Sequence, residues 1–257
     1  MLVRDDVVIG QPAHAWISGQ LARAWGNAGF PAPAPREPVC LAAEQHDVGW
    51  QDADLEPLRG EDGRPLSFIE YPRPAHIAIW RDAARRLLAQ SRYAALLVSL
   101  HGTSLYERAD PDEHPPEVAA AIRAYLRDER DRQRELAAGL DPEEVARNRR
   151  LIAVLDRLSL ALCRRVPVTL DDVPGADGPA ALRLEHVAAG AAGGDYDAEG
   201  GGRDDHAVPP GAPTAHATLA PWPFTAAALV VGCEGRRLGA DGTIGDWVPL
   251  RFALSPG

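Results

Sequence analysis

The heptapeptide EQHDVGW, residues 44–50, contains the adjacent pair His46-Asp47, followed by Gly49 and Trp50. A His-Asp pair is common by chance, so its meaning depends on whether other residues can share a metal ion with it. The surrounding pattern predicts a helix over about residues 38–48, which Gly49 would end. Neighbouring residues on a helix point about 100° apart, so both side chains could lean toward one ion.

Other expected helices carry polar side chains on faces that are otherwise apolar. These helices begin near Pro12, near Pro74, at about residue 91 and at Asp141, and the polar residues on them are His14, His76, His101 and Asp156. A single buried histidine is most often a satisfied core residue. A buried carboxylate without a partner is costly, however, because it loses its hydration. Convergence of these side chains with His46 and Asp47 on a metal would compensate all of them at once.

The ligand types favour a transition metal. Neutral imidazole together with carboxylate oxygen suits Fe, Mn, Zn or Co better than Ca or Cu(I). An aspartate has two oxygens and can bridge two ions, and two ions about 3.5–4 Å apart can clamp a phosphoryl group and activate the water between them. We therefore expect one or two divalent ions, with Fe or Mn preferred and Zn or Co as alternatives.

The order H…HD…H…H…D resembles that of the HD-domain superfamily, an all-α fold of metal-dependent phosphohydrolases. The intervals from Asp47 to His76, from there to His101 and from there to Asp156 are 29, 25 and 55 residues. HDVGW resembles the HDxGK element of the HD-GYP branch. More narrowly, HAWISGQLARAW, LVSLHGTSL and the late WPF resemble an uncharacterised bacterial family of unknown function within this superfamily.

This resemblance implies a role for each candidate residue. The metal ligands would be His14, His46, Asp47, His76, His101 and Asp156. Asp47 would bridge two ions, the second of them held by His76 and His101, and these three residues would form the catalytic centre.

The sequence departs from the HD-GYP pattern at the position expected to contact phosphate, and no GYP motif follows. Trp50 replaces the lysine of HDxGK; it could stack on a substrate ring or pack in the core. Arg73 could supply the missing positive charge for substrate binding, or it could be a solvated loop residue.

The resemblance and the residue pattern together predict a mainly α fold. An HD-like helical bundle with an N-terminal strand would span residues 1–170. A small antiparallel β appendage would span residues 171–257, with a terminal hairpin formed by residues 227–238 and 247–254. The Gly-, Ala- and Asp-rich residues 189–215 would form a flexible loop.

Composition excludes several classes of function. The net charge of −10 argues against a nucleic-acid polymer as partner. No lysine occurs in the chain, which rules out Schiff-base chemistry and a Walker A site. There is no run of eighteen apolar residues and no signal-peptide pattern, so no membrane partner and a cytoplasmic location are expected.

The expected function is hydrolysis of a small phosphorylated molecule, a phosphoester or a nucleotide, by a metal-dependent enzyme. Two alternatives remain open. One is a di-iron oxygenase on the same ligand set, and the other is a non-catalytic module that binds a metal or a ligand. The oligomeric state is left open as well.

Overall fold

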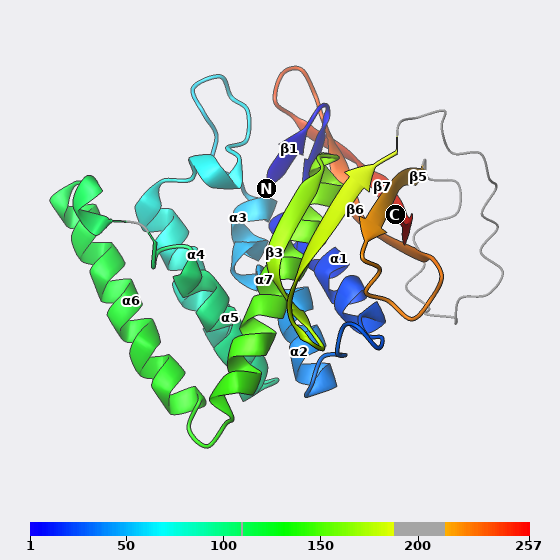
Figure 1. Cartoon of the computed structure of the whole chain (residues 1–257). Coiled ribbons are helices and arrows are strands. Elements are labelled where there is room, and N and C mark those ends of the chain that lie inside the picture. The colour runs from blue at the N-terminus through cyan, green and yellow to red at the C-terminus, as the bar shows by residue number, and fades with distance from the viewer. Residues whose placement is uncertain (109, 188–213) are drawn as a thin grey trace.

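A computed structural model describes residues 1–108, 110–187 and 214–257 of the chain. In Figure 1 a group of helices lies beside a sheet, and α6 is the helix farthest from that sheet. Within the segment predicted to be a flexible loop, residues 189–213 lie outside the described residues, and residues 214–215 begin strand β5.

The described helices largely match those predicted from the sequence. They are α1 (Gln11–Ala24), α2 (Arg36–Gln45), α3 (Gln51–Leu55), α4 (Arg73–Leu87), α5 (Arg92–Ser104), α6 (Pro116–Leu136) and α7 (Pro142–Arg164), with 3-10 turns η1 (Val48–Trp50), η2 (Phe68–Glu70) and η3 (Pro111–Glu113). Proline in the first turn starts α1, α4, α6 and α7, where its missing N–H is not needed. None of the described helices is both long and apolar enough to span a membrane.

The described strands form a single seven-stranded sheet in the order β1-β2-β6-β7-β5-β4-β3. They are β1 (Leu2–Arg4), β2 (Val7–Ile9), β3 (Val168–Gly175), β4 (Gly178–His186), β5 (Thr214–Ala220), β6 (Leu229–Leu238) and β7 (Ile244–Pro256). The predicted terminal hairpin is confirmed as the antiparallel β6–β7 pair. Strands β5 and β7 run parallel, and the other neighbours are antiparallel.

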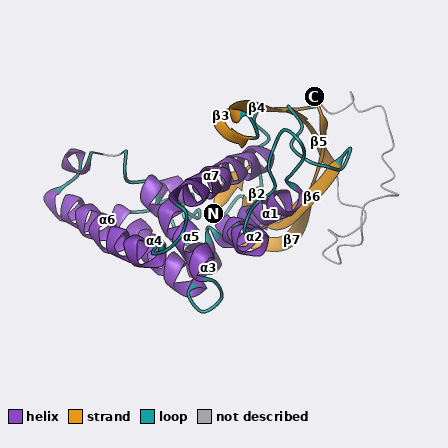
Figure 2. Ribbon diagram, turned by 60° about the horizontal axis from the view of Figure 1, so that its bottom comes forward, coloured by secondary structure: helices purple, strands orange, loops and turns teal. Residues whose placement is uncertain are grey.

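The prediction of a mainly α bundle with a small β appendage is wrong, because the fold is mixed α/β. The N-terminal hairpin pairs through β2 with β6, so both ends of the chain enter one sheet. Figure 2 shows this sheet curling around α1 and the end of α7, and these helices contact β6 and β3 respectively. Strand patterns reveal that a segment is extended, but not which distant segment it pairs with.

Helices and sheet share one hydrophobic core. Ile17 and Leu155 from the helices belong to the same buried cluster as Leu182 and Phe252 from the sheet. The predicted boundary between residues 170 and 171 falls inside β3.

One polar contact ties α1 to the sheet. The side-chain amide of Gln20 donates to the carbonyl of Gly232 at 2.7 Å and accepts from its N–H at 3.0 Å. This contact anchors α1, the helix that carries His14, against β6.

Gly49 has a different role from the predicted one. Helix α2 ends at Gln45, and Asp47 has already left helical geometry, with φ −105° and ψ 20°. Gly49 follows inside η1, where a Cβ atom would lie 2.3 Å from the carbonyl oxygen of Ile79 on α4. The glycine is required because the segment after His46-Asp47 packs directly against the backbone of α4.

Candidate metal centre

Five of the six predicted metal ligands converge inside the helical layer. His14 lies in the first turn of α1, His46 directly after α2, Asp47 just before η1, His101 near the end of α5 and Asp156 within α7. We call these five side chains the His/Asp cluster. They include two groups whose potential ligand atoms lie within 4.8 Å of one another, and His46 belongs to both.

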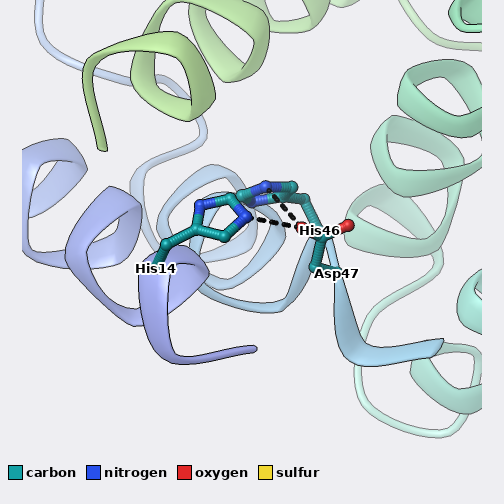
Figure 3. A group of neighbouring side chains, drawn as sticks. All are labelled: His14, His46 and Asp47. Carbon is teal, nitrogen blue, oxygen red and sulfur yellow. Dashed lines mark hydrogen bonds and ion pairs between the residues drawn. The ribbon is translucent and has the colours of Figure 1, made fainter. Parts of the chain in front are cut away.

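Asp47 joins the first two histidines of the cluster, as Figure 3 shows. Its Oδ2 atom lies 2.7 Å from His14 Nε2 and 3.5 Å from His46 Nε2. Gln11 donates to the same oxygen at 3.3 Å. The side chain of Asp47 is only 4 % exposed, so its negative charge is shielded from water and stabilised mainly by these contacts.

Asp156 approaches the cluster from the opposite helix. Its Oδ1 atom lies 3.4 Å from His46 Nε2, and its Oδ2 atom lies 3.7 Å from His101 Nε2. The side chain of Asp156 is 16 % exposed and is the most accessible of the five. Any exchange with solvent is therefore easiest beside Asp156.

The orientation of the His46 ring leaves a lone pair without a donor. Its Nδ1 atom lies 2.8 Å from the carbonyl oxygen of Ala43, which can only accept, so Nδ1 carries the hydrogen. The Nε2 atom is buried and has no hydrogen-bond partner among the described residues. In a neutral ring this lone pair would face the carboxylates of Asp47 and Asp156, an arrangement that requires a cation or a second proton.

His14 is oriented in the same way by a serine. Ser159 Oγ donates its only hydrogen to the carbonyl oxygen of Asp156 at 2.8 Å. In the His14 tautomer that carries its hydrogen on Nδ1, this nitrogen donates to Ser159 Oγ, which lies 2.9 Å away. The Nε2 atom of that tautomer lies 2.7 Å from Asp47 Oδ2, which requires a cation or a second proton between them, as at His46. Hydrogen bonds that fix an imidazole in this way are typical of metal-binding histidines.

Replacing Ser159 by alanine is expected to weaken metal affinity by about 10–100-fold while the protein stays folded, because the His14 ring loses the bond that orients it. Affinity would be measured by competition with a chelator of known strength. Ser104→Ala is the matched control, since Ser104 also donates to the carbonyl three residues earlier. Equal affinities of the two variants would show that Ser159 does not support a ligand.

The spacing around His46 fits a divalent ion, and so does the charge of the cluster. Two ligand atoms each about 2.1 Å from one ion lie roughly 3–3.5 Å apart. The separations of His46 Nε2 from the Asp47 and Asp156 oxygens, 3.5 and 3.4 Å, match this range. Two carboxylates and neutral imidazoles also balance the charge of a divalent cation.

Electrostatics within the cluster favour positive charge at its centre. Burial by itself would lower the pKa of His46, but the negative charges of Asp47 and Asp156 raise it to about 9. Burial would raise the pKa of Asp156, but the neighbouring histidines, His46 foremost, hold it well below its usual value. Burial lowers the pKa of His101 to about 4, so this ring stays neutral near pH 7.

His76, the sixth predicted ligand, lies apart from the cluster. Trp80 donates its indole N–H to His76 Nε2 at 3.3 Å, and His76 Nδ1 bonds the hydroxyl of Tyr106. Burial and the positive charge of Arg73 lower the pKa of His76 to about 4. In this arrangement the ring has no free lone pair, so a second ion between His76 and His101 would require Trp80 to move.

The two predicted substrate-binding residues differ in exposure. Trp50 is 1 % exposed and packs edge to face against Tyr71 and His76, which favours its role in the core over stacking with a substrate. Arg73 is exposed at the start of α4 and interacts with the side chain of Tyr106. It remains available for an anionic substrate.

Sequence reasoning missed the residues that hold the ligands in place. Gln11 lies three residues before His14, Ser18 four residues after it, and Ser159 three residues after Asp156. All three are buried, and the two serines share a hydrogen bond of 3.0 Å. Their spacing places them on the ligand-bearing faces of α1 and α7, and this helical spacing is the signal that could have revealed them.

Comparison with known proteins identifies the family. The profile described as "Protein of unknown function (DUF3891)" matches residues 1–240. The chain belongs to this family. The expected membership of a family of unknown function is thus confirmed, whereas nothing supports placing this DUF3891 chain in the HD-domain superfamily, whose all-α fold it does not share. No curated protein and no solved structure matches the chain.

Proposed function

We propose that the His/Asp cluster holds one divalent transition-metal ion and that the protein hydrolyses phosphoesters of small molecules. The observation that carries this proposal is the buried Nε2 atom of His46, which lies between two carboxylates without a hydrogen-bond partner among the described residues. A metal ion satisfies this atom and neutralises both carboxylates. A bound divalent ion would polarise a phosphoryl oxygen and lower the pKa of water.

Other residues of the chain would orient the metal ligands and bind the substrate. Ala43 and Ser159 fix the rings of His46 and His14, so the ligands are oriented before a metal binds. A substrate would approach beside Asp156, the most accessible member of the cluster. Arg73 would bind a phosphate oxygen, because a guanidinium makes strong charge-assisted hydrogen bonds to phosphate.

The test begins with the metal content of protein purified without a chelator or a histidine tag. We expect stoichiometric Mn or Fe, and hydrolysis of an aryl phosphate that a chelator abolishes and Mn²⁺ restores. His46→Gln should remove both properties, whereas His114→Gln, in the loop after η3, should remove neither. Absence of metal that neither Mn²⁺ nor Fe²⁺ can restore would overturn the proposal.

The enclosure of the cluster favours a second candidate, a metal-binding module without catalysis. His14 and His46 are fully buried and Asp47 is nearly so, which restricts substrate access. Stoichiometric metal without hydrolysis of any phosphoester would favour this candidate. Bound iron with substrate-dependent consumption of O₂ would instead favour the oxygenase.

A further inference from the structure

A second candidate site lies at the surface, where β1, η2 and the end of α7 meet. It is a cavity of about 410 Å³, within the range of small-molecule sites. Its lining residues are Leu2, Val3, Arg4, Ser67, Phe68, Ile69, Arg164 and Val166. None of them belongs to the His/Asp cluster.

Exposed aliphatic side chains gather around this cavity. Val3 is 37 % exposed, Val166 is 44 % exposed and Ile69 is 72 % exposed. Large apolar side chains scattered singly over a surface need no explanation, but a group of them around one cavity is typical of a binding site. These three side chains offer apolar contact to a short hydrocarbon chain.

Two arginines line the same cavity, and no carboxylate does. Arg4 is 12 % exposed, and its Nη1 atom donates to the carbonyl of Cys163 at 2.9 Å. Its Nε atom is buried and has no hydrogen-bond partner within the described residues, and Asp5 approaches it only to 3.9 Å. The positive charge of Arg4 is therefore only partly compensated, and it would attract an anion placed in the cavity beside it.

The second arginine, Arg164, is exposed and packs against an aromatic ring. The guanidinium of Arg164 lies over Phe68, 5.4 Å from the ring centroid, and forms no ion pair in the described part of the chain. Stacking leaves the edge of a guanidinium free to donate hydrogen bonds. The cavity is thus positively charged in a chain whose net charge is −10.

We propose that this cavity binds a small carboxylate with a short apolar chain. The carboxylate bonds the exposed guanidinium of Arg164, because a guanidinium matches a planar carboxylate with two parallel hydrogen bonds. The positive charge of Arg4 beside it adds attraction. The chain lies against Val3, Ile69 and Val166. This inference does not depend on the His/Asp cluster or on its proposed function.

Calorimetric titration of the full chain with octanoate tests the proposal. We expect saturable binding to the wild type, with octanamide and acetate each at least about tenfold weaker, since one lacks the charge and the other the chain. Arg4→Gln and Arg164→Gln should each weaken octanoate binding about tenfold or more. Arg236→Gln is the matched control, because Arg236 lies over the ring of Trp247 at 5.3 Å, outside the cavity.

These outcomes distinguish a specific binding site from nonspecific apolar binding. Absence of saturable octanoate binding, or equal affinities of the Arg164 and Arg236 variants, would overturn the proposal, and so would equally tight binding of octanamide. If Arg4→Gln has a lower melting temperature than the wild type, the test rests on Arg164→Gln and Val166→Glu, since both of these positions are exposed. Val166→Glu should also weaken binding, because it puts a negative charge beside the carboxylate.

Discussion

Replacing Asp47 by asparagine is expected to strip the protein of metal and to lower Mn²⁺-dependent phosphoester hydrolysis at least about 100-fold, since even outer partners of metal ligands contribute about 10–100-fold. Asp47 is the carboxylate that His14 and His46 both face, at 2.7 and 3.5 Å. Asparagine keeps its shape but removes the negative charge that a divalent ion needs. It also replaces one carboxylate oxygen, which now accepts hydrogen bonds, by an amide nitrogen, which can only donate them.

Metal content would be measured by elemental analysis together with a thermal melt of the metal-free protein. Asp82→Asn is the matched control, because Asp82 is a half-exposed carboxylate on α4 that pairs with Arg86. We expect wild-type metal content in that control. Full metal stoichiometry in Asp47→Asn would show that Asp47 is not a ligand, whatever the effect on hydrolysis.

Replacing Gly49 by alanine is expected to destabilise the fold by about 2–4 kcal/mol and to lower the melting temperature by roughly 10 °C. The added Cβ atom would lie 2.3 Å from the carbonyl oxygen of Ile79 and 3.1 Å from the Cβ of Ala83. The first of these is a backbone atom of α4, so relief requires the helix or η1 to move. No side-chain rotation can remove the clash.

Gly29→Ala provides the control for the change in backbone entropy. A Cβ at Gly29 would meet only the Asn27 side chain, at 3.6 Å, which is an ordinary van der Waals contact. Both variants would be followed by thermal unfolding monitored by circular dichroism. Equal melting temperatures would mean that η1 and α4 are not packed as closely as described.

Sequence patterns predicted most of the helical layer correctly. Proline in the first turn, Asp141 as a cap and apolar periodicity are local signals, and each reports on the structure of the residues that carry it. Polar residues on apolar faces likewise identified five side chains that the fold brings together. A polar or charged side chain is costly to bury without a partner, so its place on an apolar helix face could be recognised from the sequence alone.

What the sequence by itself determined was therefore the positions of the helices and the residues of the His/Asp cluster. Only the tertiary structure decided which strands pair, because the partner of Val7 is Arg237, 230 residues away, and strand periodicity holds no information about partners. Tertiary packing also decided that Trp80 and Tyr106 occupy the nitrogens of His76, and that Gly49 faces the backbone of α4. These contacts join residues from different elements, so their energies depend on distances that exist only once the chain has folded.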